Sequence, residues 1–238
     1  MENLNPVHHV IEVFSNAWWI MNISLIIIII SILFLTKNKS ISQRETVAKV
    51  IALVLFIDFV FNQALMYYSD KWLITYSLPL ELCSLSVFLG IYILLSKSQI
   101  GYELLICWSA GAVHSFLTPE ITTGGSLINH IDYTISHGGI LLSGFYATTR
   151  LGYRPRPKSW LTIFYYSQLL LPIIGFLDFY LNANYMYLRI KPLVDNPFII
   201  GDWPYYIIGL EFVALTHFYL SCKLHEWLSK KSSEVNSV

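Results

Sequence analysis

The sequence has little charge. Only 13% of its 238 residues are charged, and 15 basic residues balance 15 acidic ones. Zero net charge without a basic stripe gives no support to nucleic-acid binding. The three cysteines and seven histidines follow none of the usual ligand spacings, so we expect no zinc or other metal. A Gly-rich phosphate loop and a dinucleotide fingerprint are also lacking, and we expect no cofactor.

Long apolar stretches dominate instead. Hydrophobic residues make up 55% of the chain and the mean hydropathy is +0.55, which is outside the range of ordinary soluble domains. A membrane span needs about 20 mostly apolar residues, and uniformly apolar runs fit helices rather than barrel strands. The sequence therefore predicts an all-α polytopic membrane bundle of about seven transmembrane helices. The expected spans are 17–36, 47–69, 78–95, 100–117, 130–149, 161–181 and 203–222.

The loops differ in their content of Lys and Arg. Alternating loops place twelve of these residues on one side and three on the other, so the positive-inside rule predicts an outside N-terminus and a cytoplasmic C-terminus. No Ser- or Pro-rich linker interrupts the chain. We expect a single domain at residues 1–228 and a polar cytoplasmic tail at 229–238. Basic residues follow the first span, which favours a retained span over a cleaved signal peptide.

Acids and amides occur at mid-membrane depth. Asp58 and Asn62 are four residues apart and share a helix face, and Asp178 and Asn182 repeat this spacing. Glu211 lies in the last span without a local base. Acids at this depth usually face the bundle interior and mark an ion or proton path. Two interpretations stay open, which are hydrogen-bonded structural devices and residues that bind a cation or relay protons.

A second polar group is expected at the outer ends of the spans. Cys83 lies one turn inside the third span, which Pro79 is expected to open, and His114 and His137 lie in the fourth and fifth spans. A thiol attacks as thiolate, so it needs a nearby imidazole or a positive helix end. In the fifth span, His137 shares its face with a tyrosine and a threonine, while Asp132 is expected to point elsewhere. The three cysteines are expected at different depths, which predicts no structural disulfide.

Three segments carry a resemblance to a known family. They are LPLELCSLSVFLG in the third span, HIDYTISHGGILL in the fifth, and NYMYLRIKP followed by GDWPYYIIGLE before and within the seventh. With them the chain resembles the YwaF-type bacterial integral membrane proteins, which are related to the eukaryotic acyltransferase called transmembrane protein 164. The resemblance covers the second to seventh spans and implies a multi-pass protein of a bacterial cell membrane.

The relatives imply a lipid transacylase, an O-acyltransferase that uses phospholipids and lysolipids. An acyl chain would pass from a phospholipid to Cys83 and then to a lysolipid, with His137 as the best match for the assisting histidine and His114 as the second. Arg189 and Lys191 are expected to hold the headgroup. The other expected substrate contacts are Glu81, Tyr133, Asn184 and Tyr185.

Three functions therefore stay open from the sequence. The first is this acyltransferase, in which helix-end N–H groups, Tyr133 or Thr134 stabilise the oxyanion. The second is a proton- or cation-coupled transporter that uses Asp58, Asp178 and Glu211. The third is a non-catalytic lipid-binding membrane protein. The sequence predicts no particular protein partner.

Overall fold

The structure is a computed structural model and describes residues 9–192 and 198–236, except for the side chains of 233–236. The described part contains seven α-helices in the order expected from the apolar stretches. Their bounds are Asn16–Thr36 (α1), Ile41–Tyr68 (α2), Leu82–Ser96 (α3), Gln99–Leu117 (α4), Leu127–Arg150 (α5), Ser159–Leu181 (α6) and Tyr205–Asn236 (α7). The predicted all-α fold is thus confirmed.

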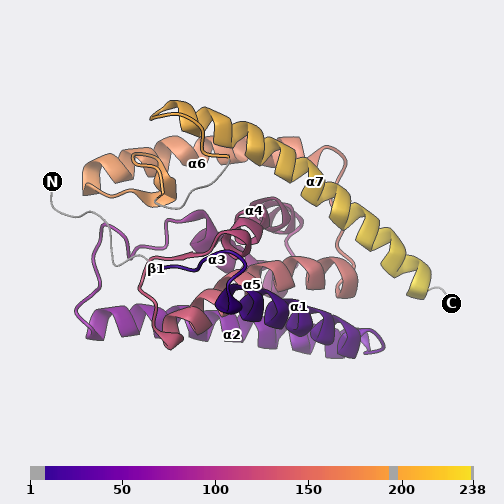
Figure 1. Cartoon of the computed structure of the whole chain (residues 1–238). Helices are drawn as coiled ribbons and strands as arrows, with labels where there is room; N and C mark the ends of the chain where they lie inside the picture. The colour runs from indigo at the N-terminus through magenta and orange to yellow at the C-terminus, as the bar shows by residue number, and fades with distance from the viewer. Residues whose placement is uncertain (1–8, 193–197, 237–238) are drawn as a thin grey trace.

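The helices form three layers (Figure 1). Helices α1 and α2 lie on one side, α3, α4 and α5 lie in the middle, and α6 and α7 cover the other side. Helix α5 contacts α1, α2, α3, α4 and α7. The fifth helix, which carries the predicted histidine, is therefore at the centre of the bundle.

Serine side chains define where four of the helices begin. Ser15, Ser40, Ser98 and Ser126 each accept a hydrogen bond from a backbone N–H in the first turn of α1, α2, α4 and α5. At α2 the Gln43 side chain also reaches back to the Ser40 N–H, which completes a capping box. Each cap satisfies a donor that would otherwise lack a partner at a helix end.

Two consecutive glycines allow α5 to lie close to its neighbours. A Cβ atom on Gly139 would lie 2.2 Å from Cδ2 of Leu55, and one on Gly138 would lie 2.5 Å from Cδ1 of Leu25. Small residues at such positions let membrane helices approach closely. The pair thus fixes the distance from α5 to both α1 and α2.

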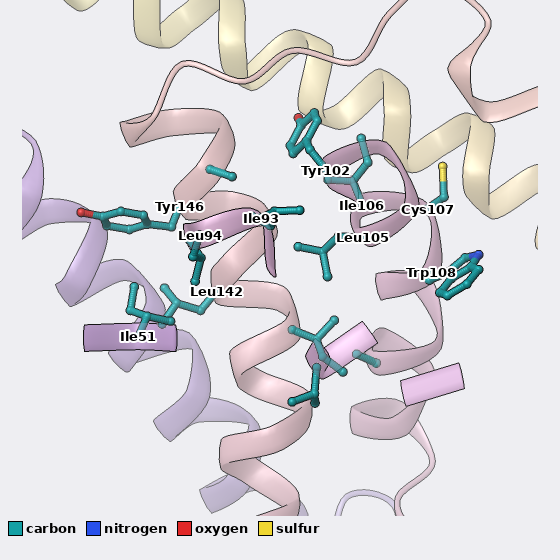
Figure 2. Close-up of a cluster of buried hydrophobic side chains, with 14 of the residues drawn as sticks. Ile51, Ile93, Leu94, Tyr102, Leu105, Ile106, Cys107, Trp108, Leu142 and Tyr146 are labelled. Atoms are coloured by element: carbon teal, nitrogen blue, oxygen red, sulfur yellow. The ribbon is translucent and has the colours of Figure 1, made fainter. Parts of the chain in front are cut away.

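The main apolar core fills the space between α2, α3, α4 and α5. Figure 2 shows Ile51, Ile93, Leu105 and Leu142 from these four helices converging there. Ile93 and Leu105 are fully buried. Cys107, on the opposite side of α4, points toward α7 (Figure 2).

Large apolar side chains also cover the outside of the bundle. Examples are Ile20 and Phe34 on α1, Phe179 on α6 and Phe212 on α7, each more than 65% exposed. A soluble protein rarely exposes a patch of this extent, whereas hydrocarbon solvates it. Five of the described helices are long and apolar enough to cross a membrane, namely α1, α2, α4, α6 and α7. The molecule is therefore a multi-pass membrane protein.

The remaining two helices are the central ones. Helix α3 has only 15 residues, and α5 has 24 but carries His130, Asp132 and His137. Both pack mainly against other helices rather than against lipid. Neither is an independent span by length and composition, and the sidedness of the termini stays a prediction.

The polar segment expected from Ser229 continues α7 to Asn236. Within it, the Ser232 hydroxyl donates to the Thr149 carbonyl oxygen at 2.9 Å. This part of α7 therefore packs on the end of α5. Near the start of the chain, His9–Val10 (β1) pairs antiparallel with Glu120–Ile121 (β2).

Candidate active site

A cavity of about 310 Å³ lies where α3 and α5 begin and where α2 and α4 end. We call it the Cys83 cavity. The connection before α3, strand β2 and the short 3-10 turn Tyr185–Tyr187 (η1) complete its wall. Its polar lining includes Cys83, His137, Ser115, Tyr133, Ser136, Asp58, Asn62, Asp132, Glu81, Asn184 and Tyr187. Two of the three predicted catalytic residues, Cys83 and His137, thus share one cavity.

Cys83 is the second residue of α3. The helix begins at Leu82, and Glu81 in the N-cap position makes no side-chain capping bond. Pro79 was expected in the first turn but precedes the helix, so that expectation was wrong. The later start brings Cys83 closer to the helix N-terminus, where unpaired N–H groups present a positive potential to an anion.

Helix α4 passes close beside the thiol. The Cys83 sulfur lies 3.9 Å from the Ser115 hydroxyl oxygen, and a Cβ atom on Gly111 would lie 3.7 Å from the sulfur. Helix α4 therefore passes the thiol at a distance that leaves room for a methyl group at position 111 but not for a large side chain.

His137 is held in one tautomer. Its Nδ1 lies 3.0 Å from the Tyr133 carbonyl oxygen, which can only accept a hydrogen bond. We assign the proton of the neutral ring to Nδ1, which can donate it to this oxygen or to the Ser136 hydroxyl at 3.1 Å, so Nε2 is left unprotonated. The Tyr133 ring stacks on the imidazole with centroids 4.2 Å apart. These contacts give the orientation and tautomer that a general base needs.

Tyr133 also connects the histidine to the surroundings of the thiol. Its hydroxyl donates to the Ser115 carbonyl oxygen at 2.6 Å, while its own carbonyl oxygen receives the His137 proton. Ser115 in turn contacts Cys83. A continuous series of contacts thus runs from Cys83 on α3 through α4 to His137 on α5.

His114 lies elsewhere. His217 donates from Nδ1 to the Val213 carbonyl oxygen at 2.7 Å, so its Nε2 accepts a bond from Nε2 of His114 at 3.0 Å. His114 is not in the lining of the Cys83 cavity. Helix α4 directs it toward α7, which favours His137 as the partner of Cys83.

Asp132 lies in the cavity wall, contrary to the expectation that it points elsewhere. Asn62 of α2 lines the same cavity and lies close enough to the Asp132 carboxyl group to interact with it. Asp58 lines the same cavity. Asp58 and Asn62 were expected nearer mid-membrane than Cys83, but the end of α2 forms one wall of the cavity, so these three residues line it together. Their depth in a membrane stays a prediction.

The expected substrate contacts separate into two groups. Tyr133, Glu81 and Asn184 line the cavity, and Glu81 accepts the Met186 backbone N–H at 2.9 Å. Tyr185, Arg189 and Lys191 do not line it. Since no Lys or Arg occurs among the described lining residues, the cavity offers no cation to a headgroup.

Arg189 instead closes the end of α6. Its guanidinium donates to the carbonyl oxygens of Asp178 and Ala183 and to the side-chain oxygen of Asn182, at 3.0–3.1 Å. Lys191 lies 3.7 Å from Asp202 on the surface. These contacts give Arg189 a structural role at a helix C-terminus.

The other predicted acids are separate from the cavity. Asp178 is buried and accepts the Tyr185 backbone N–H at 2.7 Å, which attaches η1 to α6. Glu211 on α7 accepts a hydrogen bond from Gln168 on α6. Each therefore connects neighbouring elements.

Tyr187 is a lining residue that the sequence reasoning missed. It follows Met186 in η1, and both have φ values near +55°, a conformation that residues other than glycine rarely adopt. Burial raises the pKa of Tyr187, so its hydroxyl stays protonated and can donate. Its position in the NYMYLRIKP segment could have pointed to Tyr187, but only other residues of that segment were named from the sequence.

The model of the TMEM164 family matches residues 13–222, which includes every lining residue of the cavity. The chain belongs to the TMEM164 family. The expected relation to transmembrane protein 164 is thus confirmed, while the YwaF-type branch and a bacterial origin stay predictions. No curated protein and no solved structure shows a significant match. The roles of individual TMEM164-family residues in this chain therefore rest on the geometry of the cavity.

Proposed function

We propose that this TMEM164-family protein is a membrane acyltransferase that moves an acyl chain from a phospholipid to a lysolipid through a thioester on Cys83. The observation that carries the proposal is the shared cavity of Cys83 and His137. A cysteine with an oriented base is the arrangement that nucleophilic acyl transfer requires. Such a cavity in a membrane protein would receive its lipid ester from the surrounding bilayer.

The first half-reaction forms the thioester. Nε2 of His137 takes the thiol proton, and the Cys83 sulfur attacks the carbonyl carbon of the phospholipid ester. The resulting tetrahedral oxyanion collapses, the ester C–O bond breaks, and the alkoxide leaving group takes the proton from His137. The products are a lysophospholipid and acyl-Cys83.

The second half-reaction reverses these roles. His137 removes the proton from the hydroxyl of an acceptor lysolipid, and its oxygen attacks the thioester carbonyl. The C–S bond breaks and the thiolate recovers the proton from His137. No oxidant, metal or nucleotide is needed for this exchange of esters.

Donors for the oxyanion are available beside the sulfur. Backbone N–H groups in the first turn of α3 have no partners within the helix, and the Tyr187 hydroxyl lies in the same wall. The Tyr133 hydroxyl, an expected donor, is already bonded to Ser115. We therefore assign the oxyanion to the α3 terminus and Tyr187 in preference to Tyr133.

The size of the cavity limits what enters it. Small-molecule sites occupy about 300–1,000 Å³, and this cavity is at the lower end at about 310 Å³. It accommodates the ester and glycerol region of a lipid, so the acyl chains must extend along the apolar helix faces.

A transporter is less well supported. Asp58 lines the Cys83 cavity, whereas Asp178 and Glu211 bond to partners between α6 and its neighbours. The apolar core separates this end of the bundle from the other. Asp178 and Glu211 are absent from the described lining of the cavity that holds Asp58, so the three acids do not share one site.

The test is acyl transfer in vesicles that contain the purified protein, labelled phospholipid and unlabelled lysolipid. Cys83→Ala and His137→Ala should abolish transfer, while Cys107→Ala and His130→Ala, which change the same residue types outside the cavity, should retain it. Full activity in Cys83→Ala would overturn the mechanism. Lipid binding without transfer by the unaltered protein would indicate the non-catalytic alternative.

A further inference from the structure

A second cavity, of about 390 Å³, lies at the opposite end of the bundle. We call it the basic cavity. It lies between the start of α2, the ends of α3 and α5, the residues after α5 and the last turns of α7. The acyl-transfer mechanism does not use it.

Its lining carries an excess of positive charge. Arg44, Lys97, Arg150 and Arg154 line it, and Glu45 is the one acidic residue among the described lining residues. Glu45 pairs with Lys97 at 2.6 Å, and neither Arg44 nor Arg150 has an acidic partner among the described lining residues. Like charges held together favour an anion between them.

Two polar groups of this wall are buried without a partner. They are Nε of Arg44 and the hydroxyl of Tyr153. Burying such a donor without a hydrogen bond costs about 1–3 kcal/mol, and more when the group is charged. Both residues line the basic cavity, so one ligand with several acceptor oxygens could satisfy both.

The chain itself holds these two donors in place. The two terminal nitrogens of the Arg44 guanidinium donate to the carbonyl oxygens of Lys37 at 2.6 Å and Arg150 at 3.4 Å. Nε is the nitrogen of this group that has no hydrogen-bond partner. The Tyr153 ring packs on Tyr102 with centroids 5.0 Å apart. Burial raises the pKa of Tyr153, so its hydroxyl remains a donor.

Arg150 contributes charge more than hydrogen bonds. Its guanidinium donates to the Leu33 carbonyl oxygen, to the Thr36 hydroxyl and to the Thr149 carbonyl oxygen. It therefore joins α5 to the end of α1. Arg44 and Tyr153 are left as the specific contacts for a ligand.

We propose that the basic cavity binds a phosphate group, with Arg44 and Tyr153 as its hydrogen-bond donors and the charge of Arg150 as a further counter-charge. Phosphate supplies acceptor oxygens for both donors and a negative charge opposite to that of the wall. Arg is the residue best suited to the geometry of phosphate. The phosphate belongs either to an anionic lipid headgroup or to a soluble ion. Because α2, α5 and the residues after α5 all contribute, bound phosphate stabilises their contact.

The experiment uses the full-length protein in nanodiscs. One arm adds phosphatidic acid to phosphatidylcholine nanodiscs and the other adds inorganic phosphate to phosphatidylcholine nanodiscs. Bound lipid is counted by native mass spectrometry, and thermal unfolding is followed in both arms. Stabilisation by phosphatidic acid alone assigns a lipid headgroup, stabilisation by inorganic phosphate alone assigns a soluble ion, and either supports phosphate recognition.

Matched variants separate a specific site from general surface charge. Arg44→Lys keeps the charge but removes Nε, and Tyr153→Phe removes only the hydroxyl. Each should weaken phosphate binding about tenfold, as expected for a lost charge-assisted hydrogen bond. Lys39→Gln, which removes an exposed charge outside the lining, should leave binding unchanged.

Absence of stabilisation in both arms would overturn the proposal, and so would equal weakening in Lys39→Gln. If Arg44→Lys does not fold, Tyr153→Phe decides the question, because it keeps the packing of the ring and should fold. Unchanged binding in Tyr153→Phe would then refute the assigned contacts.

Discussion

His137 donates from Nδ1 to the Tyr133 carbonyl oxygen, one helical turn earlier in α5, at 3.0 Å. Because the proton is on Nδ1, Nε2 is the ring nitrogen that can accept another proton. The stacked Tyr133 ring restricts rotation of the imidazole. A backbone carbonyl cannot be removed by substitution, so this orientation depends on the helix itself. The tautomer of the proposed base is therefore fixed by local structure.

Replacement of the histidine separates its role in proton transfer from its role in packing. His137→Asn should lower acyl transfer at least about 100-fold, within the range that general base catalysis contributes. The protein should remain folded because Asn still offers a donor near Nδ1. Circular dichroism and thermal unfolding check the fold, and unchanged transfer in His137→Asn would show that His137 is not the base.

The hydroxyl of Tyr133 is predicted to position α4 rather than to take part in chemistry. Tyr133→Phe removes the 2.6 Å bond to the Ser115 carbonyl oxygen and keeps the ring on His137. The expected loss is about 1 kcal/mol in the free energy of unfolding, with a modest decrease in transfer. Loss of transfer as complete as that in Cys83→Ala would instead make Tyr133 a catalytic donor.

Gly111 is predicted to control space beside the thiol. An added Cβ atom would meet the Cys83 sulfur at 3.7 Å, an ordinary contact, so Gly111→Ala should keep most activity. Gly111→Leu should block access to Cys83 and abolish its alkylation by a membrane-permeant maleimide. Equal alkylation rates in both variants would contradict the close approach of α4.

The contact between α5 and α2 depends on Gly139. Gly139→Ala places a methyl group against Leu55, which is 2% exposed and cannot move aside without repacking. We expect a loss of about 1–3 kcal/mol in the free energy of unfolding. The double variant with Leu55→Ala should lose less than the sum of the two single variants, because the shorter side chain makes room. Strict additivity would argue against the contact.

Cys107 and Cys222 give a test of the contact between α4 and α7. Their sulfurs lie 3.7 Å apart, so mild oxidation with copper phenanthroline should join them. Of the three thiols that maleimide labels in the denatured, reduced protein, only that of Cys83 should remain after oxidation. Three labelled thiols after oxidation would show that α4 and α7 are not adjacent at this level.

The order and approximate positions of the helices could be predicted from the apolar runs, because hydrophobic content along the chain determines them locally, whereas the ends of α2, α3 and α7 differ from the expected ones. The relative depth of residues on different helices could not be predicted in this way. Cys222 was expected near the end of a helix that stops at residue 222, but α7 runs from Tyr205 to Asn236, so Cys222 lies in its interior beside Cys107. The expectation that these two cysteines lie at different depths was therefore wrong.

The candidate site was predictable only in part for a related reason. The family segments led to Cys83 and His137, but helical spacing alone does not show which faces of different helices meet. Asp132 and Ser115 lie in the cavity wall because of how α5 and α4 pack, and Tyr187 lies there because of the backbone conformation of η1. Arg189 was expected at a headgroup because of its charge, whereas it satisfies carbonyl groups at the end of α6.

The most direct test of the central claim is mass spectrometry of the protein after a short incubation with phospholipid and no acceptor. The proposed mechanism predicts an acyl group on the peptide that contains Cys83, removed by hydroxylamine, absent in Cys83→Ala, and lost when lysolipid is added. An unmodified Cys83 peptide from a protein that transfers acyl chains would contradict the thioester and with it the assigned roles of Cys83 and His137.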